Sequence, residues 1–267
     1  MPPEDDQLAQ RNLPEYDLSE IVKKVRAQTP ARLLAGRSGA AYTTNTQLEL
    51  REAHAAARDA VRAELDLATN LGEDFVRKWN LFEVCSQAAS KDQYLLRPDL
   101  GRHLNEASRA EVTRRCTTGH DLQVVIGDGL SVTAVALQVP RLLPLLCEGA
   151  KTRGWSVGEI FAIRYCRVGM LNEIGELLAP KVAVLLVGER PGLATAESLS
   201  AYMAYQPKAS DTDANRNLIS NIHARGVSTE QAAERILNLA ASMMKTQKSG
   251  CQLREELPAV IHQEITR

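Results

Sequence analysis

Residues 181–192 read KVAVLLVGERPG, and this stretch decides the fold. Apart from Ala183, every residue from 182 to 187 is Val or Leu, with no alternation of polar and apolar side chains. Such a run is typical of a central parallel strand that is covered on both faces. The GERPG segment that follows (188–192) brings charge into a loop shaped by glycine and proline. Ligands of open α/β sheets bind beyond the carboxyl ends of such strands, so this loop is the first candidate for a functional edge.

Two further strands are predicted upstream. Residues 122–126 form a buried strand that leads through GDGLS (127–131) into an apolar helix ending near residue 147. Residues 160–165 form another strand, followed by CRVGM (166–170), and a short helix at 172–178 leads to the strand at 181. This alternation predicts right-handed βαβ units in an α/β fold, with a mostly parallel, Rossmann-like sheet flanked by helices. GDGLS, CRVGM and GERPG are therefore expected at one edge of the sheet.

Outside this core the chain reads mainly as helix. Helices are predicted at residues 18–25, at 47–65 behind a capping box of Thr46 and Glu49, at 100–115 with Asp99 as cap, and from Ser228 to about residue 248. Residues 199–206 fit a strand or a short helix. The predicted division is a disordered tail (1–17), a helical N-terminal region (18–118), an α/β domain (119–250) and a C-terminal tail (251–267).

Composition limits the possible functions. The formal net charge is -1, and no basic face interleaved with aromatic residues occurs, so nucleic-acid or membrane-surface binding is not expected. The apolar runs are too short to span a membrane, and the acidic start MPPEDDQLAQ does not resemble a secretory signal, so a cytoplasmic location is expected. Five scattered cysteines without a CxxC pair indicate neither a disulfide framework nor a zinc site.

The three loops could bind an anion, because glycines allow backbone N–H groups to approach it. GDGLSV resembles the first half of a dinucleotide fingerprint, but Val132 stands where the third glycine is needed. The polar residues expected to cluster there are Asp128, Arg167, Glu189 and Arg190, which could equally form mutual salt bridges and helix caps. No catalytic motif and no metal-ligand set is visible, so the residues alone predict a ligand-holding α/β domain.

Six motifs carry a family resemblance. They are ARLLAGRSGA (31–40), RPDLGRHL (97–104), VVIGDGLS (124–131), RYCRVGMLNEIGELL (164–178), LLVGERPGL (185–193) and DANRNLISNIH (213–223). Together, in this order, they resemble the small subunit of ethanolamine ammonia-lyase over about residues 31–250.

The resemblance implies an adenosylcobalamin-dependent lyase that converts ethanolamine to acetaldehyde and ammonia by a radical mechanism. In this family a TIM-barrel large subunit holds ethanolamine and the reacting groups, and the small subunit closes over the cobalamin. The cofactor carries the difficult chemistry, while protein supplies position and excludes water. The chain alone is then expected to be inactive, with residues 18–118 contacting the large subunit. Packaging in a bacterial microcompartment is a further expectation from the family.

Carried over by motif, the cobalamin contacts fall at Val168, Glu189 and Leu218, with no catalytic and no metal-binding residue in this chain. Leu218 departs from family members that carry Cys at this position; Leu serves if the contact is main chain or packing, but not if a thiol is needed. A salt bridge of Glu189 with Arg190 or Arg216 is the structural alternative for that residue. For the whole chain the alternatives are a non-catalytic interaction subunit, which docks through residues 47–65, and an orphan α/β domain for a nucleotide-like ligand.

Overall fold

A computed structural model of the chain describes residues 18–28, 33–192 and 195–255. Contacts divide the chain into two units, Met1–Glu49 and Leu50–Arg267. The predicted tail at 1–17 lies outside the described residues, as does the part of the predicted C-terminal tail from 256 to 267.

The first unit contains a helix, a small hairpin and the start of a second helix. Its elements are α1 (Leu18–Gln28), β1 (Arg37–Ser38), β2 (Ala41–Tyr42) and the beginning of α2 (Thr44–Arg62). The predicted capping box is wrong, because Thr43 precedes the helix and its Oγ1 accepts the hydrogen bond of the Thr46 N–H at 3.3 Å. Glu49 accepts instead from the Asn45 side chain.

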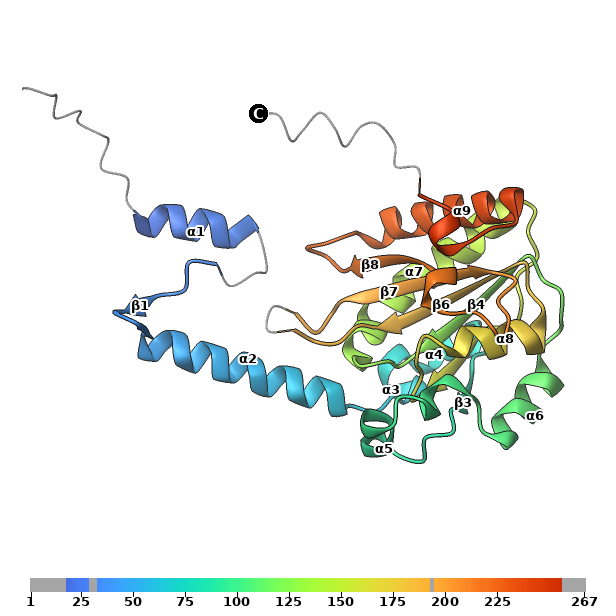
Figure 1. The fold of residues 1–267 in the computed structure, drawn as a ribbon, viewed down its shortest axis with the longest axis horizontal. Helices are drawn as coiled ribbons and strands as arrows, with labels where there is room; N and C mark the ends of the chain where they lie inside the picture. The colour runs from blue at the N-terminus through green and yellow to red at the C-terminus, as the bar shows by residue number, and fades with distance from the viewer. Residues whose placement is uncertain (1–17, 29–32, 193–194, 256–267) are drawn as a thin grey trace, which may run out of the picture. The chain divides into compact units, whose positions relative to one another are not determined.

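The second unit is built on a six-stranded sheet in the order β3-β5-β4-β6-β7-β8 (Figure 1). β3, β5, β4 and β6 are parallel, whereas β7 is antiparallel to both β6 and β8. The sheet is therefore mostly parallel, as predicted. Its strands are β3 (Phe82–Cys85), β4 (Leu122–Gly127), β5 (Phe161–Arg164), β6 (Val182–Gly188), β7 (Leu199–Tyr205) and β8 (Asn217–Ile222).

β6 is buried on both faces along its whole length, as its sequence predicts. Val182, Val184 and Leu186 belong to the apolar cluster that includes α7 (Val132–Thr152) and α9 (Thr229–Thr246). The alternate residues, from Ala183 to Val187, belong to the cluster on the other face with α6 (Glu106–Arg115) and α8 (Met170–Leu178). The period of two along a strand thus gives a three-layer α/β/α arrangement.

Several predicted elements differ from the observed ones. The helix predicted at 100–115 is divided into a short turn η1 (Leu100–Arg102) and α6, because the Asn105 side chain accepts from the Ser108 N–H and starts a new helix. Asp99 caps neither; its carboxylate binds Arg97. Of residues 199–206, for which the sequence leaves strand and short helix open, residues 199–205 form strand β7. The range 18–118, which the sequence predicts to be helical, also contributes the edge strand β3.

The remaining elements are α3 (Leu67–Leu71), α4 (Glu73–Lys78), α5 (Lys91–Leu96), η2 (Asp213–Asn215) and η3 (Gly250–Gln252). The predicted capping box of Ser228 and Gln231 at the start of α9 is confirmed. After η3, Asn217 donates to the Leu253 carbonyl and Arg235 pairs with Glu255, so residues 251–255 are bonded to the domain. Among the described helices, α7 is the one long and apolar enough to cross a membrane, and its inward residues pack in the core.

Candidate functional site

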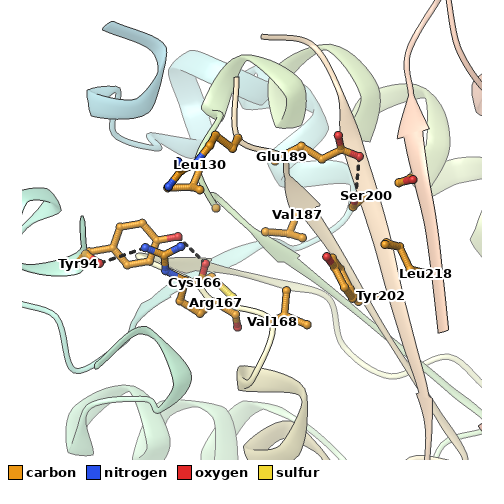
Figure 2. Close-up of a pocket in the computed structure, with 14 residues that line it drawn as sticks. Tyr94, Leu130, Cys166, Arg167, Val168, Val187, Glu189, Ser200, Tyr202 and Leu218 are labelled. Atoms are coloured by element: carbon orange, nitrogen blue, oxygen red, sulfur yellow. Dashed lines mark hydrogen bonds between the residues drawn. The ribbon is translucent and has the colours of Figure 1, made fainter. Parts of the chain in front are cut away.

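A cavity of about 400 Å³ lies where the predicted loops converge (Figure 2). Residues 129–130, 166–168 and 188–190 supply one part of its lining, from the carboxyl ends of β4, β5 and β6. Tyr94 of α5 and residues of β7 and β8 supply the rest. Parallel strands bring these three segments to one edge, so the convergence predicted from the sequence is confirmed.

Close contact between two loops shapes one wall of the cavity. Gly129 has φ of +56°, and a Cβ added there would lie 2.4 Å from the Gly188 carbonyl oxygen. The Leu130 N–H donates to that same oxygen at 3.0 Å. Only glycine allows both this backbone conformation and this approach, so the GDG and GERPG loops are held against each other.

A buried ion pair lies behind the cavity wall. The Lys91 ammonium is 3.3 Å from Asp128 Oδ2, with side chains 6% and 0% exposed. Lys91 also donates to the Gly129 carbonyl, and Asp128 Oδ1 accepts from the Cys166 N–H at 2.9 Å. Burial raises the pKa of the Asp128 carboxyl, against the opposing effect of Lys91. The pair links α5 to the loops after β4 and β5, and so fixes their relative positions.

Tyr94 and Arg167 form one end of the cavity. The Tyr94 ring is fully buried, and its hydroxyl donates to the Cys166 carbonyl at 2.8 Å. The Arg167 guanidinium lies over this ring, 4.3 Å from its centroid, and donates to the Tyr94 carbonyl at 3.3 Å. Burial raises the pKa of the Tyr94 hydroxyl, which is therefore neutral and acts as a hydrogen-bond donor.

Glu189 lies in another part of the cavity (Figure 2). Its Oε1 accepts from the Ser200 hydroxyl at 2.6 Å and from the Asn221 N–H at 2.9 Å. These contacts hold the side chain, and no ion pair with Arg190 or Arg216 occurs among the residues that the structure describes. Burial, followed by the Glu189 charge, raises the pKa of the nearby Tyr202 hydroxyl.

Val168 and Leu218 line the same cavity as Glu189, so the structure brings all three predicted contact residues together. They come from three segments that are far apart in sequence. Leu218 lies directly opposite Tyr202 in the register of β8 and β7, and it is 45% exposed. Val168, Val187, Leu130 and Leu218 give the cavity apolar surface beside its polar groups, and Val187 lies between Arg167 and Glu189 in the view of Figure 2.

Sequence reasoning missed four residues at or behind this cavity, namely Lys91, Tyr94, Ser200 and Tyr202. Lys91 and Tyr94 lie in a polar segment, KDQYLL, whose composition carries no signal for a buried role. Ser200 and Tyr202 lie on β7, whose antiparallel pairing with β6 brings them to the cavity. A strand prediction at 199–206 would have indicated Ser200 and Tyr202, because it would have placed both residues in the sheet.

The chemistry available in the cavity is binding chemistry. Its lining supplies one carboxylate, two guanidinium groups and several hydroxyls, but no histidine. Cys166 is fully buried and burial raises its thiol pKa well above the ordinary value, so the thiol is not a nucleophile at neutral pH. Over residues 18–28, 33–192 and 195–255, no group of three His, Cys, Asp or Glu side chains is arranged to hold a metal ion.

A second cavity, also of about 400 Å³, lies between α8, residues 102–109 and residues 209–216. Several of its charged groups are engaged with one another or with backbone groups. Glu173 pairs with Arg109 at 2.5 Å and accepts from the Leu104 N–H, and Arg216 pairs with Asp213. These contacts explain the cluster as a polar link between elements.

Fold and cavity together define an α/β domain with an open pocket at the carboxyl edge of its mostly parallel sheet. The sequence profile of the ethanolamine ammonia-lyase light chain (EutC) matches residues 19–254. The ethanolamine ammonia-lyase small subunit of Clostridium perfringens is 40% identical over 235 residues, covering 88% of this chain and 78% of that protein. The small subunit of Fusobacterium nucleatum is 41% identical over 249 residues, covering 89% and 82%. The small subunit of Pseudomonas syringae pv. tomato is 41% identical over 237 residues, covering 87% and 82%. The chain belongs to the ethanolamine ammonia-lyase small-subunit family.

Proposed function

We propose that this chain is the small subunit of an adenosylcobalamin-dependent ethanolamine ammonia-lyase and covers part of the cofactor at the interface with a large subunit. The observation that carries the proposal is the meeting of Val168, Glu189 and Leu218 in one cavity. The family resemblance selects these residues one by one, from three separate motifs. Their convergence, together with family membership, supports a shared role in binding one ligand.

The cavity fits one side of a cobalamin. A volume of about 400 Å³ encloses a drug-sized molecule, and a corrinoid is much larger. Most of the cofactor must therefore be covered by another protein surface, which is the expected role of the TIM-barrel large subunit. We assign the contacts of this chain to the periphery of the cofactor, where apolar and hydrogen-bonding groups of the kind in the lining find partners.

Each contact residue suits a particular part of that periphery. Val168 and Leu218 offer apolar surface to the ring edge and its methyl groups. Glu189 Oε1 already has two donors, and its remaining acceptor capacity is suited to an amide N–H or hydroxyl of the ligand. When bound, adenosylcobalamin supplies the radical chemistry, and this chain holds the cofactor in position and excludes water.

The conversion of ethanolamine to acetaldehyde and ammonia belongs to the assembled enzyme in this proposal. Ethanolamine and the reacting groups reside mainly on the large subunit, and the small subunit alone is inactive. The α/β domain at 119–250 covers the cofactor, and the region at 18–118 contacts the large subunit. We propose that the complex is cytoplasmic. Packaging in a bacterial microcompartment is a further proposal that follows from the family resemblance.

A second candidate is an assembly role, with cofactor contacts incidental. It is favoured by helix α2, whose apolar positions Leu50, Ala53, Ala57 and Val61 are only half-buried. Two matched variants separate the candidates. Val168→Glu in the cavity should abolish cobalamin retention by a complex that still assembles, whereas Ala57→Glu on α2 should impair assembly. Cobalamin retention that is unaffected by Val168→Glu would favour the assembly role and contradict the proposed one.

A further inference from the structure

Arg167 differs from the other partly buried arginines of this chain. Among the described residues, four arginines are half-buried. Arg164 pairs with Glu64, Arg216 with Asp213, and Arg235 with Glu255. Arg167 has no carboxylate partner in that part of the chain, although it lines the cavity. Removing a guanidinium from water without a counter-charge is costly, so its position calls for a partner that the described chain does not supply.

The buried carboxylate behind the cavity wall already has partners. Asp128 lies behind the same wall, but Lys91 compensates its charge and its second oxygen accepts from the Cys166 N–H. Glu189 is held in another part of the cavity by Ser200 and the Asn221 N–H. Neither carboxylate forms an ion pair with Arg167.

The Arg167 side chain is nevertheless fixed in place. Its stem packs against Gly101, where an added Cβ would lie 2.6 Å from the Arg167 Cγ. The guanidinium stacks on Tyr94, and the backbone N–H of Arg167 donates to the Gly101 carbonyl at 2.8 Å. Of the five side-chain N–H donors, one has an acceptor among the described residues, the Tyr94 carbonyl. Nε is buried without a partner. This is a preorganised cation with unused donors, which suits a planar, charge-assisted contact to an oxyanion.

The cavity therefore presents two unlike polar ends. Glu189 offers acceptor oxygens to neutral donors, and Arg167 offers a positive charge. Val187 lies between them in the view of Figure 2. An occupant that satisfies both ends carries amide or hydroxyl groups in one part and a phosphate-like oxyanion in another.

The geometry points to Arg167 as the binding residue for a phosphate oxyanion in this cavity. This inference rests on the proposed function, in which the oxyanion is the phosphodiester of the nucleotide tail of adenosylcobalamin. Inorganic phosphate offers the same chemistry, and the experiment separates the two sources.

The test compares adenosylcobalamin with adenosylcobinamide, which lacks the nucleotide tail. Both are titrated by absorbance against the assembled complex containing wild-type, Arg167→Gln, Arg167→Lys or Arg141→Gln small subunit. Arg141 is exposed on α7 and serves as the matched control. We expect Arg167→Gln to weaken cobalamin binding by about tenfold or more, the size of a charge-assisted hydrogen bond, and to leave cobinamide binding within about twofold. Arg167→Lys should recover part of the loss, and Arg141→Gln should change neither constant.

Retained cobinamide binding also shows that the variant is folded and assembled. Equal weakening of both ligands, or no effect on cobalamin, overturns the inference. If Arg167→Gln leaves both corrinoid constants unchanged but abolishes the binding of inorganic phosphate to the complex, the site belongs to free phosphate, and the phosphodiester assignment is overturned. A wild-type complex that retains no cobalamin at all contradicts the proposed function itself, and is thereby distinguished from these outcomes.

Discussion

The Lys91 ammonium and the Asp128 carboxylate form an ion pair that is almost sealed from solvent and joins three segments behind the cavity. Removal of one partner leaves the other charge buried and uncompensated, which typically costs about 3–5 kcal/mol. We expect Lys91→Met to reduce the free energy of unfolding by that amount. The double variant Lys91→Met/Asp128→Asn should be more stable than Lys91→Met alone, because no buried charge remains. Urea denaturation measures both, and additive losses would contradict the pairing.

Glu189 provides the most direct test of a cofactor contact from this chain. Glu189→Gln keeps the size of the side chain but removes the charge that strengthens its hydrogen bonds. We expect the cobalamin Kd of the complex to rise roughly fivefold, corresponding to about 1 kcal/mol, with little change in ethanolamine affinity. Glu148→Gln, an exposed position on α7, is the control. An unchanged cofactor Kd in Glu189→Gln would refute the assignment.

Leu218 tests whether the Cys that other family members can carry is needed at the proposed cobalamin contact. Leu218→Cys should alter the cobalamin Kd by less than about threefold, because packing against the ligand requires only apolar surface. Leu218→Asp places a charge on that surface and should weaken binding by at least about tenfold. Absorbance titration of the complex gives both constants. A large gain in affinity for Leu218→Cys would mean that the thiol contributes to binding. The wild-type chain, which has Leu at this position, would then bind cobalamin less tightly than a chain with Cys.

Gly129 tests the close contact between the GDG and GERPG loops. Gly129→Ala meets a positive φ, which costs roughly 1–2 kcal/mol, and places a Cβ 2.4 Å from the Gly188 oxygen, which adds an overpacking cost of about 1–3 kcal/mol. Gly154→Ala is the matched control, since Gly154 has φ of +74° with open space around its Cβ position. It should show the first cost alone. Equal unfolding free energies for the two variants would argue against the contact.

Asp121 should make the α/β domain less stable at acid pH than at neutral pH. A hydrogen bond from Lys181, then bonds from Ser156, lower the pKa of its carboxyl below the ordinary 3.8. A depressed pKa in the folded state contributes stability that is fully present above pH 3.8 and is lost as the pH falls through the lower value. Asp121→Asn should therefore be less stable than wild type at pH 7, and the difference should shrink below about pH 4. Urea midpoints at both pH values measure it; a pH-independent difference would contradict the mechanism.

Much of this architecture could be predicted from local sequence. The Val and Leu run of β6 has no polar alternation, so both of its faces had to be covered, and the βαβ alternation then placed three loop segments at one edge. The motif resemblance added Val168, Glu189 and Leu218, which do share a cavity.

The remaining features depend on contacts between distant residues. Lys91 looks like a surface lysine until Asp128, 37 positions away, compensates its charge. The four-residue strand β3 is too short for a clear pattern, and it is held by parallel pairing with β5 and by the stacking of Phe82 on Phe161 at 5.2 Å. Arg167 stands out only when its neighbours are known, because a missing counter-charge has no sequence signature.

The central claim is that this chain shares a cobalamin site with a large subunit. The most direct measurement is to purify the chain with and without a co-expressed large subunit, add adenosylcobalamin, and follow cobalamin absorbance and ammonia release from ethanolamine through gel filtration. The account predicts that cobalamin and activity appear together only in the complex. A chain that stays alone in the presence of the large subunit, or one that turns over ethanolamine unaided, would contradict it.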